Sequence, residues 1–311
     1  MWNVSATGTM SLGSARGDDT GAPPVARPDA SDVWHPPGFG AMMRLPVANL
    51  GFSDRFCFRL LAGLASFQIR AIHGLANILP GRDPFILALN HSTMREWATV
   101  PVLLMTLRGG RYIHFLADWN FRIVPGIGFM MRRGRVITIA RKDAKPKFLT
   151  VFRRLYDNPV PAMERARNLL TAGSPIGIFP EGRINRDARR LLPGRNGAAR
   201  LSIETGVPVV PVGIRFPAAD QDKPIGENQP MEVHIGAALQ PVKNADPKLA
   251  DVRAWHAVIM TDIARLSGKS WTPRRLSRPG PRMATPVETA PEIDQEPEAG
   301  APITGIIPGS P

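Results

Sequence analysis

The sequence predicts an α/β fold: a single domain with a mixed, largely parallel sheet flanked by helices, and disordered N- and C-terminal tails. Three observations support this prediction. Short apolar runs of strand length alternate with longer segments that have the period of a helix. Hydrophobic residues make up 43% of the 311 residues, which is enough for a sizeable core. Both ends are rich in Pro, Gly and small residues, which bury little apolar surface.

The two tails set the expected domain boundaries. Residues 1–45 contain the stretch GAPPVARPDASDVWHPPGFG, and residues 273–311 hold nine prolines, with five acidic residues between Glu288 and Glu298. Such segments cannot bury enough apolar surface to offset the chain entropy that is lost on folding. The folded domain is therefore expected over residues 46–272.

Between these tails, the expected elements alternate along the chain. The runs predicted as strands are PFILAL (84–89), YIHFLA (112–117), RVITIA (135–140), PIGIF (175–179), VPVVPVGI (207–214) and MEVHIG (231–236). The segments predicted as helices are 53–78, 93–108, 160–172, 196–205 and 248–266. Each strand run is short and mostly apolar, whereas the helical segments are longer, and alternation of the two is typical of an α/β domain.

The segment 53–78 has a narrow basic stripe on a mostly apolar surface. At a turn of about 100° per residue, Arg55, Arg59 and Arg70 share one side of the helix. Two interpretations remain open. The segment is either an interfacial membrane helix, or a helix that packs on the core with its basic side in water.

The charge balance favours an anionic partner. Lys and Arg total 39 against 26 Asp and Glu, a formal net charge of +13, which suits nucleic acid, an anionic membrane surface or phosphorylated substrates. The sequence carries no zinc-finger or RNA-recognition signature, and only 7% of its residues are aromatic, so nucleic-acid binding is not expected. An anionic membrane surface and phosphorylated substrates remain.

The cysteine and histidine content limits which disulfides and metal sites the chain can form. Cys57 is the only cysteine, which excludes an intramolecular disulfide and a Cys-based zinc site, and no two of the six histidines are spaced i, i+4. No metal and no cofactor are therefore expected. The N-terminus lacks the pattern of a signal peptide, and no run of about 18 apolar residues appears. These features predict a location on the cytoplasmic side of the cell membrane, peripheral or monotopic, and they say nothing of oligomeric state.

The stretch NHSTMREW (90–97) is the first candidate for chemistry. His91 follows a predicted strand, and Glu96 lies five residues later. In one interpretation, Thr93 and Glu96 form a capping box that only starts a helix. In the other, Glu96 accepts a hydrogen bond from one nitrogen of His91 and leaves the second nitrogen free as a general base. Positions i and i+5 do not share a helix face, so the pair can meet only across a strand-to-helix turn.

The stretch IGIFPEGRINR (176–186) is the second candidate. A predicted strand ends in Glu181, Gly182 and Arg183, where the glycine permits a tight turn. Arg183 could bind a phosphate through two hydrogen bonds, and Arg186 is the second candidate for this role. The alternative is a surface turn with a solvated Glu–Arg pair.

Together these stretches resemble the ordered blocks of the glycerolipid acyltransferases of the lysophosphatidate acyltransferase type. The blocks are NHSTMRE, RGRVITIAR (133–141), FPEGR and GVPVVPV, in the family's order over roughly residues 84–214. The chain departs from the family in two places. Glu96 stands where the family usually has Asp, and Arg183 follows Gly182 directly, without the Thr that commonly lies between them.

The resemblance implies an O-acyltransferase that moves a fatty acyl group from acyl-CoA or acyl-carrier protein to a lysophospholipid hydroxyl, such as that of 1-acyl-glycerol-3-phosphate. His91 would be the general base and Glu96 would orient it. Arg141 and Arg183, beside Gly182, would hold the acceptor's phosphate, and Glu181 would bind an acceptor hydroxyl. Two alternatives stay open: an acyltransferase with another acceptor, such as a lyso-aminolipid or a glycolipid, and a non-catalytic basic protein that binds membranes.

Overall fold

The computed structural model describes residues 33–140, 143 and 147–273, and these contain one mixed sheet of eight strands in the order β1-β2-β8-β7-β3-β6-β4-β5. The strands are β1 (Val33–Trp34), β2 (Ile69–His73), β3 (Ile86–Leu89), β4 (His114–Asp118), β5 (Ile137–Ile139), β6 (Ile176–Ile178), β7 (Val209–Arg215) and β8 (Met231–Ile235). The pairs β1–β2 and β7–β8 are antiparallel, and the other neighbouring strands are parallel. The predicted mixed, largely parallel sheet is confirmed.

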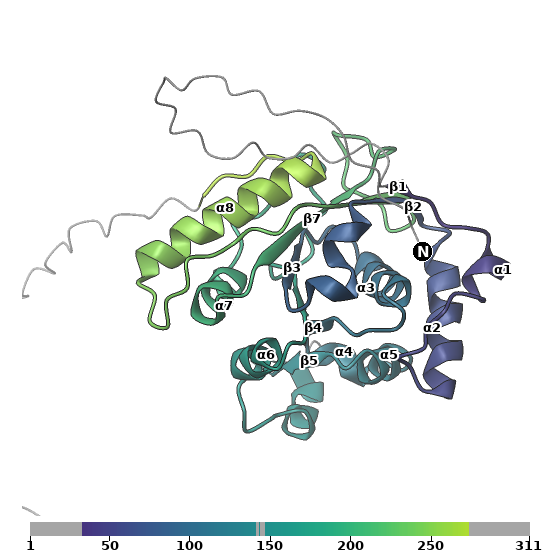
Figure 1. Ribbon diagram of the computed structural model, residues 1–311, viewed down its shortest axis with the longest axis horizontal. Coiled ribbons are helices and arrows are strands. Elements are labelled where there is room, and N and C mark those ends of the chain that lie inside the picture. The colour runs from purple at the N-terminus through teal and green to yellow at the C-terminus, as the bar shows by residue number, and fades with distance from the viewer. Residues whose placement is uncertain (1–32, 141–142, 144–146, 274–311) are drawn as a thin grey trace, which may run out of the picture. The chain divides into compact units, whose positions relative to one another are not determined.

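Helices cover both faces of this sheet (Figure 1). The α-helices are α1 (Phe39–Met42), α2 (Phe52–Ala65), α3 (Glu96–Leu107), α4 (Asn120–Ile123), α5 (Ile127–Arg133), α6 (Ala162–Thr171), α7 (Gly197–Thr205) and α8 (Leu249–Ser267), and the 3-10 helices are η1 (Leu75–Ile78), η2 (Pro80–Arg82) and η3 (Lys147–Leu155). On β3, Leu87 and Leu89 join the core with α2 and α3, while Ile86 and Ala88 join the core with α6, α7 and α8. Strand β3 is therefore buried on both faces, as its continuous apolar run predicts.

The predicted helix over residues 53–78 is wrong in its second half. Helix α2 ends at Ala65, and the chain continues as β2, where Ile69 is buried, Arg70 exposed and Ala71 buried. This alternation has the period of a strand. Strand β2 pairs with β8, about 160 residues later in the chain, and a partner at that distance leaves no local pattern in the sequence.

The basic stripe of α2 contacts the preceding segment. Arg55 donates to the carbonyl oxygens of Leu50 and Ala48, and Arg59 donates to that of Leu45. The exposed part of α2 also includes large apolar side chains: Phe52 is 90% exposed, and Phe56 and Leu64 are exposed as well. No helix within the described ranges is both long and apolar enough to cross a membrane.

Residues 33–45, placed in the N-terminal tail by their composition, belong to the described structure. Val33 and Trp34 pair with β2, and Met42 of α1 is fully buried. The ring of Phe39 lies so close to Gly63 that no side chain would fit there. Pairing with β2 and packing on α2 thus compensate for the poor composition of this segment. The rest of the predicted N-terminal tail, and the C-terminal tail beyond Pro273, lie outside the described residues.

Candidate active site

The turn between β3 and α3 carries His91 and Glu96. Its first residue, Asn90, is fully buried: its side-chain oxygen accepts from the amide of Ile214 at 2.6 Å, and its side-chain nitrogen donates to the Ile214 carbonyl at 3.1 Å. These two bonds tie the end of β3 to β7. The turn therefore starts from a fixed point at the carboxyl end of two neighbouring parallel strands, where ligands bind in open α/β sheets.

The side chains of His91 and Glu96 meet across this turn. The distance from His91 Nδ1 to Glu96 Oε1 is 2.7 Å, and the Ser92 amide donates to the same oxygen. Nε2 of His91 has no hydrogen-bond partner among the described residues. The structure places the two residues together as their spacing predicts, and their catalytic roles remain predictions.

The capping-box interpretation of Thr93 is wrong. Helix α3 begins at Glu96 with Arg95 as its N-cap, and no side chain caps it. The hydroxyl of Thr93 is buried and has no hydrogen-bond partner in the described structure. Thr93 cannot cap α3 because the helix starts later than the sequence predicts, and Glu96 instead faces back toward His91.

Burial governs the electrostatics of the pair. Glu96 is fully buried, and this desolvation raises its carboxyl pKa, while the hydrogen bond and charge of His91 act to lower it. An ionised carboxylate can only accept, so the proton between the two groups belongs on Nδ1. Nε2 then carries a lone pair, which is the arrangement that a general base needs.

Glu181 braces this turn from the loop that follows β6. Its Oε1 accepts from the His91 amide at 3.0 Å, and its Oε2 accepts from the Asn185 side chain and from the Leu192 amide, both at 2.8 Å. The Asn185 amide in turn donates to the His91 carbonyl at 2.7 Å. Glu181 is buried and is not part of the cavity wall described below. Its geometry indicates a structural brace in place of the hydroxyl contact that the resemblance implies.

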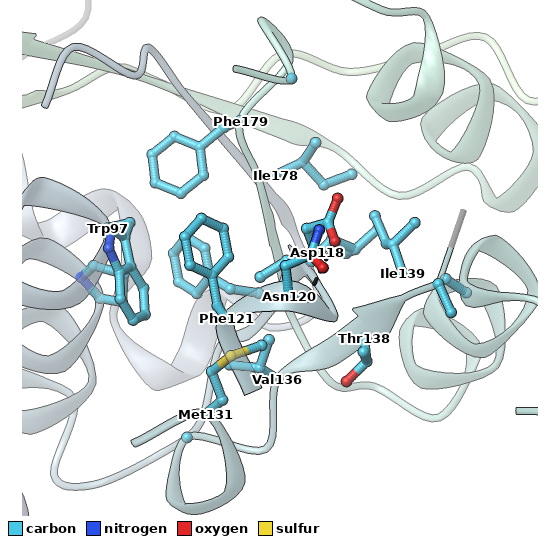
Figure 2. Close-up of a pocket in the computed structure, with 18 of the residues that line it drawn as sticks. Trp97, Asp118, Asn120, Phe121, Met131, Val136, Thr138, Ile139, Ile178 and Phe179 are labelled. Carbon is cyan, nitrogen blue, oxygen red and sulfur yellow. Dashed lines mark hydrogen bonds between the residues drawn. The ribbon is translucent and has the colours of Figure 1, made fainter. Parts of the chain in front are cut away.

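His91 lies on the wall of a large apolar cavity of about 1000 Å³. Figure 2 shows the rings of Trp97, Phe121 and Phe179 grouped on one side of this cavity, with Ile178 and Ile139 on the other. The His91 and Phe179 rings are 4.6 Å apart between centroids. A cavity of this size and character suits a long apolar ligand.

Two arginines on the cavity wall are free to bind an anion. Arg183 and Arg195 are exposed, and neither side chain has a hydrogen bond or ion pair with a described residue. Gly182 lies beside them at a φ of +67°, and a side chain there would collide with Arg195.

The sequence also predicts Arg186 and Arg141 as phosphate ligands. Arg186, the second candidate in the loop of Arg183, forms an ion pair with Glu227. Arg141 lies outside the described residues. Sequence reasoning missed Arg195, which no motif marks.

One group of side chains in the described ranges has the composition of a metal site. Potential ligand atoms of His73, Glu232 and His234 all lie within 4.8 Å of one another on β2 and β8. The two imidazole rings are stacked, 4.2 Å apart and within 6° of parallel, so their in-plane lone pairs do not converge on one point. Strand β8 is separated from β3 by β7, so this group lies away from His91. Its members are far apart in the sequence, which is why spacing could not reveal it.

Comparisons with known proteins find similar sequences among acyltransferases. Residues 70–215 match the family model described as Acyltransferase. A chloroplastic 1-acyl-sn-glycerol-3-phosphate acyltransferase of Brassica napus is 28% identical over 45% of this chain and 36% of its own length, and one of Arabidopsis thaliana is 28% identical over 50% and 39%. This chain thus spans less than half of those relatives. The crystal structure of the 1-acyl-sn-glycerophosphate acyltransferase PlsC from Thermotoga maritima aligns with a TM-score of 0.44 and 18% identity, covering 75% of this chain and 90% of that one.

The matched residues include His91, Glu96, the Phe-Pro-Glu-Gly-Arg stretch and the strand β7 to which Asn90 is tied. Residues 70–215 therefore resemble the acyltransferase family, of the type that includes the 1-acyl-sn-glycerol-3-phosphate acyltransferases.

Proposed function

We propose that this protein transfers a fatty acyl group from an acyl thioester, acyl-CoA or acyl-carrier protein, to the hydroxyl of a lysophospholipid such as 1-acyl-glycerol-3-phosphate. One observation carries the proposal: a buried glutamate holds Nδ1 of His91 at 2.7 Å, while the ring borders an apolar cavity. The relatives named above support the choice of acceptor.

His91 acts as the general base in this reaction. As the acceptor hydroxyl attacks the thioester carbonyl, Nε2 takes the hydroxyl proton, and the imidazolium that forms is stabilised by Glu96. The tetrahedral intermediate then collapses, the carbon–sulfur bond breaks, and the leaving thiolate takes the proton back from His91. The transfer is direct, and the chain has no Gly-x-Ser-x-Gly nucleophile motif. General base catalysis of this kind contributes about 10²–10⁴ in rate.

The cavity and the arginines on its wall bind different parts of the substrates. The acyl chain occupies the apolar interior, while Arg183 and Arg195 hold the acceptor's phosphate beside Gly182. Two guanidinium groups without partners among the described residues suit a phosphate because each can donate two parallel hydrogen bonds. Holding both substrates in this way lowers the barrier further by fixing their relative position.

The lipid acceptor reaches the site from a membrane surface. Phe52, Phe56 and Phe67 are all more than half exposed on or next to α2, and Phe58 and Leu61 of the same helix line the cavity. Exposed aromatic side chains next to a cavity for lipid, on a protein of net charge +13, suit peripheral binding to an anionic bilayer. We place this surface on the cytoplasmic side of the cell membrane.

The test is mass spectrometry of the products. Purified protein is incubated with an acyl-CoA or acyl-carrier-protein donor and a panel of acceptors: lysophosphatidate, other lysophospholipids, a lyso-aminolipid and a glycolipid. We expect acylated lysophosphatidate as the main product. His91→Ala should lower the rate by about 10²–10⁴ while leaving the melting temperature close to that of the wild type.

His35→Ala is the matched control, because His35 is exposed and, within the described part of the chain, its ring bonds only to the Arg70 carbonyl. It should retain the wild-type rate. Wild-type activity in His91→Ala would contradict the mechanism, and a product from another acceptor alone would contradict the choice of lysophosphatidate.

A further inference from the structure

A lysine beyond the matched region reaches into the candidate site. Lys269 follows α8 and is 7% exposed, whereas Lys223, Lys243 and Lys248 are all exposed. Its Nζ donates to Ser92 Oγ at 2.9 Å and to the Asp187 carbonyl at 2.7 Å. Ser92 directly follows His91, and the mechanism above gives this lysine no role.

The end of α8 is held so that Lys269 enters between two loops. Helix α8 ends at Ser267, and Gly268 turns the chain at a φ of +71°. Gly213 on β7 has no side chain, and a Cβ there would clash with the backbone of the last turn of α8. After the lysine, the Ser270 amide donates to the Arg189 carbonyl at 2.8 Å, and the Leu191 amide donates to the Ser270 carbonyl at 2.9 Å. These bonds fix the lysine against the loop of Glu181.

The charges around Lys269 explain why it can be buried. The charges of two buried carboxylates, Glu181 and Glu96, and of the more exposed Asp187 act on it. Burial lowers the pKa of the Lys269 ammonium, while these three acids act to raise it. A buried charge is costly unless it is paired and hydrogen-bonded, so the lysine and the acids stabilise one another.

Ser92 links the lysine to the catalytic pair. Its hydroxyl accepts from Lys269, and its amide donates to Glu96 Oε1, the oxygen that also binds His91 Nδ1. Any shift of Ser92 therefore moves the carboxylate that orients the imidazole.

We propose that Lys269 is a positioning residue for the His91–Glu96 pair: it fixes Ser92 and supplies the buried positive charge that opposes protonation of the pair. Its role in turnover rests on the proposed acyl transfer, but its effect on the charge of the pair does not. The two can therefore be tested separately.

The kinetic test compares two lysine variants. Lys269→Met should lower kcat by about 10- to 100-fold, the usual cost of losing a group that orients a functional ligand, with the KM of both substrates nearly unchanged. Lys223→Met is the control, because Lys223 is exposed and its ion pair in the described structure is with Asp220 at the surface, and it should behave as the wild type. A Lys269→Met enzyme with the kcat of the control would overturn the proposal.

The second readout needs no activity. The titration of His91 is followed by NMR with isotope-labelled histidine, its signal assigned with His91→Ala. Removing a nearby positive charge makes the His91–Glu96 pair hold its proton more tightly, whichever partner carries it. The midpoint should rise by about 0.5–1 pH unit in Lys269→Met. An unchanged midpoint refutes the electrostatic role even if the wild type transfers no acyl group.

The Ser92→Ala variant tests the positioning role of Lys269 separately from its charge. It also tests that role if Lys269→Met does not fold. It removes the hydroxyl that binds the lysine and keeps both the charge and the Ser92 amide. We expect a several-fold loss of kcat with an unchanged His91 midpoint. A Ser92→Ala enzyme with the wild-type kcat would show that the lysine positions nothing.

Discussion

Helix α3 carries a buried pair of ionisable groups at each end, and the two pairs differ in what they leave free. At the N-terminal end, Glu96 holds one nitrogen of His91, and the other nitrogen has no partner in the described structure. At the C-terminal end, Arg108 donates to both oxygens of Asp83, at 2.7 and 2.9 Å, and to the Ile78 carbonyl. The first pair keeps an open position, whereas the terminal nitrogens of the second both bind within the protein.

This difference distinguishes the candidate catalytic pair, His91 and Glu96, from the Arg108–Asp83 pair, whose role is structural. The Arg108 pair fastens α3 to η1 and to the segment before β3, and its guanidinium also lies 5.1 Å from the centre of the Phe85 ring. Unsatisfied buried atoms occur at both ends, at Glu96 Oε2 and at Arg108 Nε, so they do not distinguish the two pairs among the described residues. The difference is that Nε2 of His91 borders the cavity without a partner among the described residues, whereas the terminal nitrogens of Arg108 are bonded. Variants at the two ends should therefore affect different properties.

The largest effect is expected on stability, at the C-terminal end. Arg108→Leu leaves Asp83 without its buried partner and should lower the free energy of unfolding by about 3–5 kcal/mol, measured by urea denaturation. Arg111→Leu is the control, because Arg111 is 53% exposed and 3.9 Å from the same carboxylate, and it should cost less than about 1 kcal/mol. Equal losses in the two variants would show that the Arg108 pair is no structural tie.

The next effect is on turnover, at the N-terminal end. Glu96→Gln keeps the shape of the side chain and removes the charge that stabilises the imidazolium. We expect kcat to fall about 10- to 100-fold with little change in KM, measured by steady-state kinetics. Asp83→Asn, the same kind of change in the other pair, should leave the kcat of the folded enzyme unchanged. A loss of kcat in Asp83→Asn as large as in Glu96→Gln would remove the distinction between the two ends.

The smallest expected effect is a gain in folding stability, whereas most substitutions lower it. Because burial raises the pKa of Glu96, the folded protein binds this proton more readily than the unfolded chain, and the stability that the carboxyl contributes is lost as pH rises through its folded pKa. The amide in the Glu96→Gln variant does not titrate, so this variant should gain stability relative to the wild type between pH 4 and pH 7, by about 0.5–2 kcal/mol at neutral pH. Thermal unfolding across this range measures it, and a variant that becomes relatively less stable as pH rises contradicts it.

The sequence predicted those parts of the fold that have a local cause. Strand β3 and helix α8 follow from a short apolar run and a long helical period, and the meeting of His91 with Glu96 follows from a spacing that only a turn can satisfy. Strand β2 was missed because its partner β8 lies far away in the sequence. Arg195, which has no side-chain partner among the described residues, was missed for the same reason, since its place depends on how distant loops fold together. The two oxygens of Glu181 likewise find their partners only in the folded structure.

The contact between α8 and β7 has a consequence for the order of assembly. Lys269 belongs to the last described segment, and it meets Ser92, 177 positions earlier in the chain, only once α8 has docked on the strand at Gly213. Until then, two acids in the interior lack the ammonium that neutralises them. A chain in which α8 has not docked would carry this uncompensated charge, so docking of α8 completes both the core and the electrostatic balance of the pocket.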